Sequence, residues 1–269
     1  MTNYTELANR IRRTTLEMIC NAGSGHLGAS FSSVECLIAL YYSVMSIDNA
    51  DYQTRDRFIL SKGHAVPALY SVFYDKGWIK KEDIMSLRQL GSVCQGHPVI
   101  SSCEYIDATT GSLGQGLSIG AGMALGIGIC GRKERVYVLL GDGELNEGQI
   151  YEAALFASHR KLSNLIAFVD KNGLQMDGRT SDIIHIESIK EMFNGIGWKV
   201  LEADGHDVQS IISSCDNSSA EKPTIIILNT VKGKGVSFME NSIEFHMKIP
   251  DSREYELALS ELNGGADIS

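Results

Sequence analysis

Apolar runs alternate with helix-like segments through the second half of the chain, and this alternation restricts the possible folds more than any other feature. Strands are expected at 135–140, 164–170, 198–203 and 224–230, and helices at 147–161, 187–196 and 207–215. Continuously apolar strands are typical of sheets whose two faces are both covered by helices. We therefore expect an α/β fold with a doubly wound, mostly parallel sheet, which binds its ligands at the carboxyl ends of the strands.

The first half of the chain is predicted to be mostly helical. Leucine and isoleucine recur at helical spacing over 4–20, and Ser33 is expected to cap a second helix that runs through VECLIALYYSVM. Further elements are expected as a strand at 57–61, helices at 65–74 and 81–90, and a glycine-rich loop that leads into a helix of small residues within 107–129. The tail after Gly264 is expected to be loose. No repeat or linker divides the chain, so 1–269 is predicted to be a single domain.

Composition excludes several classes of protein. The net charge of −9 argues against a nucleic-acid or anionic-membrane binder, although a local site can still be positive. No apolar stretch reaches 18 residues, and the charged N-terminus lacks the apolar core of a signal peptide. None of the six cysteines forms a CxxC pair, so free thiols in a reducing compartment are expected. We predict a cytoplasmic protein with no membrane partner.

The segment Gly-Asp-Gly at 141–143 directly follows an expected strand. Flanking glycines let the backbone approach a ligand, and the N–H groups of a helix start can face a phosphate. A simple turn is the alternative for this tripeptide. Asn172 follows the next strand, so it and Asp142 are expected to meet at the same sheet edge as hard oxygen ligands for Mg²⁺ or Ca²⁺. A hairpin turn at Asn172–Gly173 is the alternative, although a helix rather than a strand is expected to follow.

Taken together, these segments resemble a known family. GDG followed after 28 residues by Asn resembles the diphosphate-and-metal motif of thiamine diphosphate enzymes. Four further segments, GSGHLGAS, SKGHAVPALY, QGHP and TTGSLGQG, resemble those of transketolases, and TVKGKGVSF with His246 downstream fits the end of the same domain. The resemblance covers essentially the whole chain, with the segments in family order.

The resemblance implies roles at the matching positions, with thiamine diphosphate and Mg²⁺ (or Ca²⁺ or Mn²⁺) as cofactors. The metal ligands would be Asp142, Asn172 and the carbonyl of Leu174. Gly143 would offer its backbone to the diphosphate, Gly111 would hold the 4′-amino group through its carbonyl, and Leu113 would pack near the cofactor ring. The side chains around the diphosphate or the reacting carbon would be those of Lys62, His64, Lys232 and His246. Both lysines could instead be solvated.

Histidines stand out even without the family. Four of the seven follow a glycine, where the backbone can approach a ligand and an imidazole can exchange protons near neutral pH: His26, His64, His97 and His206. The resemblance places His26 and His97 against the hydroxyl and carbonyl groups of the substrate. His206 fits no family motif and is interpreted as a turn residue. His159 and His185 are expected on the surface.

The resemblance also implies an activity and a partner. A transketolase moves a two-carbon glycolaldehyde unit from a ketose, often a phosphate, to an aldose. The pyrimidine-binding and C-terminal domains of that family are absent from this chain, so we expect a separate C-terminal subunit, an α2β2 assembly, and little activity from this chain alone. Glu147 and Glu152 resemble an acidic pair that couples active sites, with a solvated helix face as the alternative.

Two segments depart from the family pattern. The stretch FHMKIP has Met247 where a glycine usually follows the histidine, and QGHPVISSCEYID lacks the usual acidic residue after the proline. A specialised sugar substrate, such as a branched or sulfonated one, is therefore an alternative to a pentose phosphate. The sequence also leaves open the alpha subunit of a 2-oxo acid dehydrogenase, a nucleotide-binding protein that uses GSLGQG, and a non-catalytic scaffold subunit. The spacing of GSLGQG is wrong for a dinucleotide site.

Overall fold

A computed structural model describes residues 3–47 and 54–264 of the chain. Its centre is a five-stranded sheet in the order β1-β2-β3-β5-β4, in which every neighbouring pair is parallel. The strands are β1 (Arg57–Leu60), β2 (Val136–Gly141), β3 (Leu165–Lys171), β4 (Lys199–Asp204) and β5 (Thr224–Asn229). The expected α/β fold with a parallel sheet is confirmed, and all five carboxyl ends lie at one edge of the sheet.

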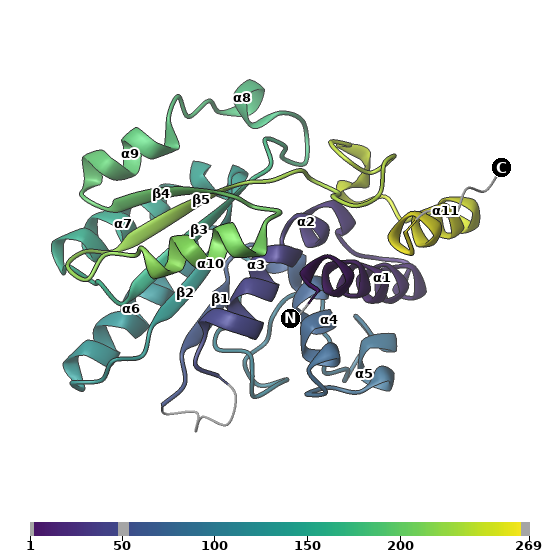
Figure 1. The fold of residues 1–269 in the computed structure, drawn as a ribbon, viewed down its shortest axis with the longest axis horizontal. Coiled ribbons are helices and arrows are strands. Elements are labelled where there is room, and N and C mark those ends of the chain that lie inside the picture. Colours follow the sequence, from purple (N-terminus) through teal and green to yellow (C-terminus); the bar gives the residue numbers. More distant parts are fainter. Residues whose placement is uncertain (1–2, 48–53, 265–269) are drawn as a thin grey trace.

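Helices cover both faces of this sheet (Figure 1). Successive residues of β2 point to opposite cores: Tyr137 and Leu139 belong to one buried cluster, whereas Val138 and Leu140 belong to the other. The helices against the first cluster are α1 (Tyr4–Ala22), α3 (Val34–Ala39), α4 (Val66–Asp75) and α10 (Val208–Asp216), and those against the second are α6 (Gln115–Ile129), α7 (Gly148–His159) and α9 (Ile189–Ile196). The continuous apolar pattern of the central strands follows from this double cover.

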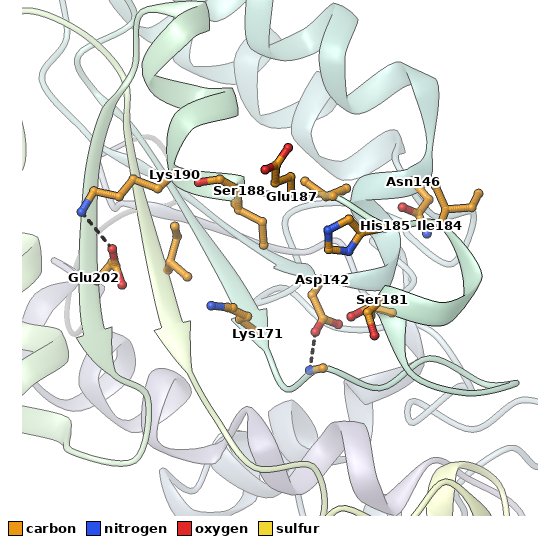
Figure 2. Close-up of a pocket in the computed structure, with 15 residues that line it drawn as sticks. Asp142, Asn146, Lys171, Ser181, Ile184, His185, Glu187, Ser188, Lys190 and Glu202 are labelled. Atoms are coloured by element: carbon orange, nitrogen blue, oxygen red, sulfur yellow. Dashed lines mark hydrogen bonds and ion pairs between the residues drawn. The ribbon is translucent and has the colours of Figure 1, made fainter.

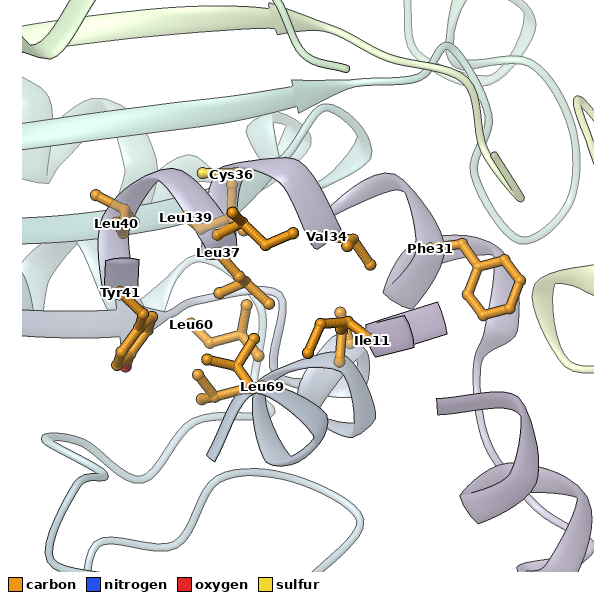
Figure 3. Packing of buried hydrophobic residues seen from close by; sticks show 14 of the residues in the cluster. Ile11, Phe31, Val34, Cys36, Leu37, Leu40, Tyr41, Leu60, Leu69 and Leu139 are labelled. Atoms are coloured by element: carbon orange, nitrogen blue, oxygen red, sulfur yellow. The ribbon is translucent and has the colours of Figure 1, made fainter. Parts of the chain in front are cut away.

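The first-half helices pack onto β1. Leu37 of α3, Leu60 of β1 and Leu69 of α4 gather in one buried cluster (Figure 3). Ser33 does directly precede α3, as expected, but its side chain makes no cap hydrogen bond: a short helix, α2 (Leu27–Ser32), ends there, and the Ser33 hydroxyl donates to the Ala29 carbonyl over 2.7 Å. The chain then continues through α3 into a π-helical turn at Leu40–Val44.

The helix of small residues packs close to the sheet. A side-chain carbon added at Gly120 of α6 would lie 2.5 Å from Cγ2 of Val138 on β2, so only glycine permits this approach. The loop before α6 is not preceded directly by a strand, which removes the dinucleotide interpretation of GSLGQG.

Three expectations differ from the structure. The predicted helix at 81–90 ends early, as α5 (Lys81–Met85). β4 lies at the sheet edge, and its side chains are mostly half-buried or exposed rather than fully covered. Besides α2, two further helices were not expected, namely α8 (Thr180–Ile183) and α11 (Ser252–Leu262). The tail predicted to be loose lies, after Gly264, outside the described residues. Across the described ranges, no helix is both long and apolar enough to cross a membrane.

Candidate active site

A cavity of about 310 Å³ opens at the carboxyl edge of the sheet, and we call it the strand-end cavity. The ends of β1, β2, β3 and β5 lead directly into residues that line it. Every residue predicted from the sequence to bind the metal, the cofactor or the substrate lies on its wall: His26, Lys62, His64, His97, Gly111, Leu113, Asp142, Gly143, Asn172, Leu174, Lys232 and His246. Segments spread over more than 200 residues of sequence therefore meet at one place.

Asp142 links the ends of β2 and β3. One of its oxygens accepts the N–H of Gly143 over 2.8 Å, and the other accepts the N–H of Gly173 over 2.6 Å. The side-chain oxygen of Asn172 accepts the N–H of Leu174 over 3.1 Å. The predicted meeting of Asp142 and Asn172 at one sheet edge is confirmed. A hairpin-like bridge does occur, but it joins Leu174 to Arg179 and lies after the Asn172–Gly173 step.

The charge of Asp142 has no partner within the described residues. The residue is 7% exposed, and no ion pair to it occurs in that part of the chain. Burial, and then the nearby charge of Asp170, raises its pKa to about 6. A buried carboxylate that is ionised near neutral pH is stabilised by a cation. A metal ion in the cavity would supply that charge.

Asp170 is a functional residue that the sequence interpretation missed. It is 1% exposed, at the end of β3, and it forms an ion pair with Lys62. It also accepts hydrogen bonds from the Ser32 hydroxyl over 2.6 Å, from the Asn172 amide over 3.2 Å, and from the Thr230 hydroxyl. Burial alone would raise its pKa, but the Lys62 charge and these hydrogen bonds hold the pKa below its usual value. The sequence feature that could have identified Asp170 is a carboxylate at the end of an otherwise apolar strand.

Two lysines lie buried in the wall, so the alternative of solvated side chains is wrong. Lys62 and Lys232 are each 1% exposed. The Lys232 ammonium donates to the Leu174 carbonyl over 3.1 Å and contacts Nδ1 of His246 at 2.8 Å, and no carboxylate pairs with it among the described residues. Burial and the charge of Lys62 lower the pKa of Lys232 to about 8. The acidic chain thus contains a locally positive site.

Three histidine rings form a cluster beside these lysines. The ring centres are 5.1 Å apart for His26 and His64, 5.3 Å for His26 and His246, and 5.7 Å for His64 and His246. Burial, and then the charge of Arg88, lowers the pKa of His26 to about 4. Burial and then the charge of Lys232 lower the pKa of His246 to about 3. Burial and the Lys62 charge also place the pKa of His64 well below its usual value. All three rings are therefore neutral at pH 7.

Hydrogen bonds define which ring atoms are available. Nδ1 of His246 accepts from the Lys232 ammonium, so the proton of the neutral ring lies on Nε2. Nδ1 of His26 is buried and has no hydrogen-bond partner within the described residues, and the same holds for Nε2 of Gln175 on the same wall. Buried polar atoms normally have partners. In the described part of the chain, these two atoms therefore lack the partners that buried polar atoms normally have.

The remaining histidines divide as expected, with one addition. His97 is exposed at the cavity rim, and its ring packs against Gly111, whose φ of 141° excludes other residues. His159 and His185 are exposed. His206 does lie in a turn, but its Nε2 also accepts the N–H of Val231 over 2.8 Å and its Nδ1 lies 3.1 Å from the Glu35 carboxylate. It therefore fixes the segment that precedes Lys232.

The acidic pair proposed for coupling lies outside the strand-end cavity. Glu147 and Glu152 are both exposed, and Glu147 is the residue that precedes α7 rather than part of that helix. Glu144, three residues earlier, was not singled out from the sequence, yet it is 2% exposed and lines the cavity. The sequence therefore did not reveal that a second carboxylate of the GDGELNEG stretch, that of Glu144, is buried.

A second cavity, of about 300 Å³, also includes Asp142 and Gly173 (Figure 2). We call it the loop cavity, because most of its wall comes from residues 180–190. Its clearest charged contact is an ion pair of 3.1 Å between Lys190 and Glu202, both substantially exposed. The histidine cluster and the buried lysines take no part in its wall.

The donors at the strand-end cavity suit a hard divalent cation. Across the described ranges, no three His, Cys, Asp or Glu side chains are placed to hold a metal. The predicted donors are of other kinds: one carboxylate from Asp142, one amide oxygen from Asn172 and one carbonyl from Leu174. Oxygen donors of this type, completed by water or phosphate, are those that Mg²⁺ and Ca²⁺ prefer. The unpaired charge of Asp142 is the structural feature that fits this cation.

The chain was compared with known protein families and sequences. The sequence pattern of the family described as "Transketolase, thiamine diphosphate binding domain" matches residues 3–256. The 6-deoxy-6-sulfo-D-fructose transketolase subunit of Clostridium sp. (strain MSTE9) is 43% identical over 260 residues, which cover 95% of this chain and 94% of that protein. An apulose-4-phosphate transketolase subunit of Phocaeicola vulgatus is 40% identical over 257 residues, 94% of this chain and 91% of that protein.

Solved structures give a matching result. A transketolase from Pichia stipitis in complex with sedoheptulose-7-phosphate superimposes with a TM-score of 0.91 at 30% identity, and the match covers 98% of this chain and 41% of that one. The transketolase of Campylobacter jejuni gives a TM-score of 0.90 at 30% identity, over all of this chain and 44% of that one. The chain thus spans about two fifths of the length of these solved structures.

Proposed function

The chain belongs to the transketolase family, and we propose that it is the diphosphate-binding subunit of a two-chain transketolase. Residues 1–269 would form a single diphosphate- and metal-binding domain. A second polypeptide would supply the pyrimidine-binding and C-terminal domains. Two relatives of nearly the same length, named as transketolase subunits, support this division. We further propose an α2β2 assembly, and a cytoplasmic location that suits the six free cysteines.

One observation carries the proposal: two opposite buried charges without ion-pair partners line the same cavity. Among the described residues, Asp142 has no cationic partner and Lys232 has no carboxylate partner. A divalent cation bound to a diphosphate would offer a positive charge to Asp142 and a negative charge to Lys232 at once. Neither a bare metal nor a bare anion would satisfy both groups.

Each predicted residue then has a position that suits its role. Asp142, Asn172 and the Leu174 carbonyl would hold Mg²⁺ or a related divalent ion. The diphosphate would be contacted by the Gly143 backbone and by side chains on the cavity wall, namely Lys62, His64, Lys232 and His246. Gly111 and Leu113, on the segment that precedes α6, would contact the cofactor ring.

Bound thiamine diphosphate would supply the carbanion that transfer of a two-carbon ketol unit requires. The chain's own contribution would be proton transfer and orientation. Nε2–H of His246 can donate to an oxygen of the sugar, and His26, on the same wall, would contact a sugar hydroxyl. His97, at the rim, would meet the substrate as it enters. Neutral imidazoles in these positions can each contribute on the order of a hundredfold or more in rate.

Reconstitution tests this function. The chain should be purified alone and together with its partner, which a neighbouring reading frame is expected to encode, and assayed for ketol transfer with thiamine diphosphate. We expect activity only from the mixture, lost with a chelator and restored by Mg²⁺. Ketol transfer by this chain alone at the rate of the mixture would overturn the split arrangement, and no transfer by an intact complex with any ketose would overturn the function.

A specialised sugar is the more specific candidate for the substrate. The relatives of matching length are named for 6-deoxy-6-sulfo-D-fructose and apulose-4-phosphate, and this chain carries an exposed Met247 directly after His246. The reconstituted complex should be given sulfonated, branched and ordinary ketose substrates, and kcat/KM compared. A higher kcat/KM for an ordinary pentose phosphate than for all the others would contradict the specialised assignment. Oxidation of a 2-oxo acid would instead favour the dehydrogenase alternative, and failure to bind the cofactor would favour a scaffold.

A further inference from the structure

Glu144 is a buried carboxylate for which the proposed chemistry has no use. It is 2% exposed, and burial raises its pKa above the usual value for a glutamate. No cation pairs with it among the described residues; instead it accepts three hydrogen bonds. Burying a carboxylate costs free energy unless such bonds compensate it, so their pattern indicates what the group does.

The three donors come from three separate segments. The Ser61 hydroxyl and the N–H of Gly114, the latter over 2.8 Å, both donate to one oxygen of Glu144. The N–H of Gly141 donates to the other oxygen over 3.0 Å. Segments that are 80 residues apart in the sequence are therefore joined through one side chain, and both of its oxygens are occupied.

Each donor is next to residues of the strand-end cavity. Ser61 precedes Lys62 at the end of β1, and Gly141 precedes Asp142 at the end of β2. Gly114 ends the segment that carries Gly111 and Leu113. The bonds thus go to three of the segments that form the cavity wall rather than to the apolar cores.

Close packing around Ser61 shows how tightly these segments are held. A side-chain carbon added at Gly116 would lie 2.8 Å from Cα of Ser61, so the start of α6 meets the end of β1 without space for any side chain. The Thr110 hydroxyl donates to the Leu60 carbonyl over 2.7 Å in the same region. Loss of the Glu144 bonds would leave the Gly114 and Gly141 N–H groups unpaired in this packed place.

We infer that Glu144 is a positioning residue that holds the Ser61, Gly114 and Gly141 segments together and so sets the geometry of the cofactor site. The identity of the cofactor at this site rests on the proposed function, whereas the action of Glu144 on the three segments does not. Glu144 lines the cavity, but both of its oxygens are occupied by these bonds, so the residues that it positions make the contacts to the cofactor.

Glu144→Gln is the sharpest test. A glutamine keeps the size but has only one acceptor oxygen, so its NH₂ group must face a backbone N–H or the serine hydroxyl. The matched control is Glu256→Gln on α11, where the side chain is exposed and takes no part in the cavity wall. Ser61→Ala, which removes one donor and little volume, is the second variant if Glu144→Gln does not fold.

Two measurements give the outcome. Hydrogen exchange on the full chain without cofactor should become faster in 111–117 and 141–143 for Glu144→Gln and remain unchanged in 66–75, whereas general destabilisation would affect all three. Titration of thiamine diphosphate with Mg²⁺ into the complex should show an affinity about tenfold to a hundredfold weaker for Glu144→Gln, and unchanged for Glu256→Gln. Unchanged exchange and unchanged affinity would overturn the inference. If the wild-type complex binds no thiamine diphosphate, the proposed function fails, and hydrogen exchange alone then decides the role of Glu144.

Discussion

Two cavities of nearly equal volume, about 310 Å³ and 300 Å³, share Asp142 but are built differently. The strand-end cavity is formed by the ends of four strands and contains two lysines that are each 1% exposed. The loop cavity is formed mainly by 180–190, where the side chains are mostly exposed (Figure 2). Volume therefore does not distinguish a binding site from a surface hollow in this molecule.

Buried charge does distinguish them. A charged group removed from water raises the free energy of the fold unless a partner compensates it. Lys62 is compensated by its ion pair with Asp170, but Lys232 and Asp142 form no ion pair among the described residues. In the loop cavity, Lys190 and Glu202 pair with each other at the surface. Asp142 faces both cavities, but the buried Lys232 lines only the strand-end cavity, so only there could one ligand meet both unpaired charges.

Substitution of Asp142 should have the largest effect on cofactor binding. Asp142 faces both cavities, but only the strand-end cavity is expected to bind the cofactor. In the reconstituted complex, Asp142→Ala should weaken Mg²⁺-dependent binding of thiamine diphosphate about a hundredfold or more, since a metal ligand and a buried charge are lost together. Calorimetric titration measures this loss, and circular dichroism checks that the fold persists. Ser181→Ala, in the loop cavity alone, is the control. Binding by Asp142→Ala within threefold of wild type would remove the distinction between the cavities.

Two matched lysine substitutions, one in each cavity, should show how differently the cavities contribute to cofactor binding. Lys232→Met should weaken cofactor binding about tenfold to a hundredfold, because a charge-assisted bond to a diphosphate is lost in a buried place. Lys190→Met in the loop cavity should change the affinity less than about twofold, because the lysine is exposed and screened. The same titration measures both. Equal losses from the two substitutions would contradict the account.

The histidine cluster predicts a pH dependence of stability for the chain without cofactor. The pKa values of His26 and His246, about 4 and 3, lie below the 6.5 of an unfolded histidine. Between pH 6.5 and about 4 these two histidines therefore bind more protons in the unfolded chain, so the stability that they contribute falls as pH falls through this window. His26→Asn should reduce that slope in thermal unfolding, whereas replacement of the exposed His185 serves as the control. A steeper slope for His26→Asn would show that the ring is not buried in its neutral form.

The smallest effect is expected at the ion pair of the loop cavity. Side chains of Lys190 and Glu202 are 59% and 44% exposed, so their pairing should contribute less than about 1 kcal/mol to stability. A double-mutant cycle with Lys190→Gln and Glu202→Gln, followed by chemical denaturation, measures the coupling. A coupling free energy well above that value would mean that this cavity is more ordered than its exposure indicates.

The sequence predicted those parts of the fold and site that depend on local pattern. Apolar runs placed the central strands, and the residues directly after them, Asp142 and Asn172, do lie side by side because parallel strands end at one edge. The edge position of β4 was not predicted, because strand order in the sheet depends on long-range packing. The helix start after Ser33 was predicted correctly, but the short helix α2 that ends just before it was not, because it has no clear sequence signal.

Asp170 and Glu144 show what a sequence alone does not contain. Asp170 accepts bonds from Ser32 and Thr230, and Glu144 from Ser61 and Gly114, and these partners are up to 138 residues away. Neither carboxylate is part of a motif that identifies a ligand. Their roles follow from burial and from the segments that they join, which become visible only when the strands are assembled.

The most direct test of the central claim is the location of the cofactor in a crystal structure of the complete complex grown with Mg²⁺ and thiamine diphosphate. The account predicts density for the metal beside Asp142, Asn172 and the Leu174 carbonyl, with the diphosphate against Lys232 in the strand-end cavity. Diphosphate density in the loop cavity beside Ser181, or a metal with no contact to Asp142, would contradict it.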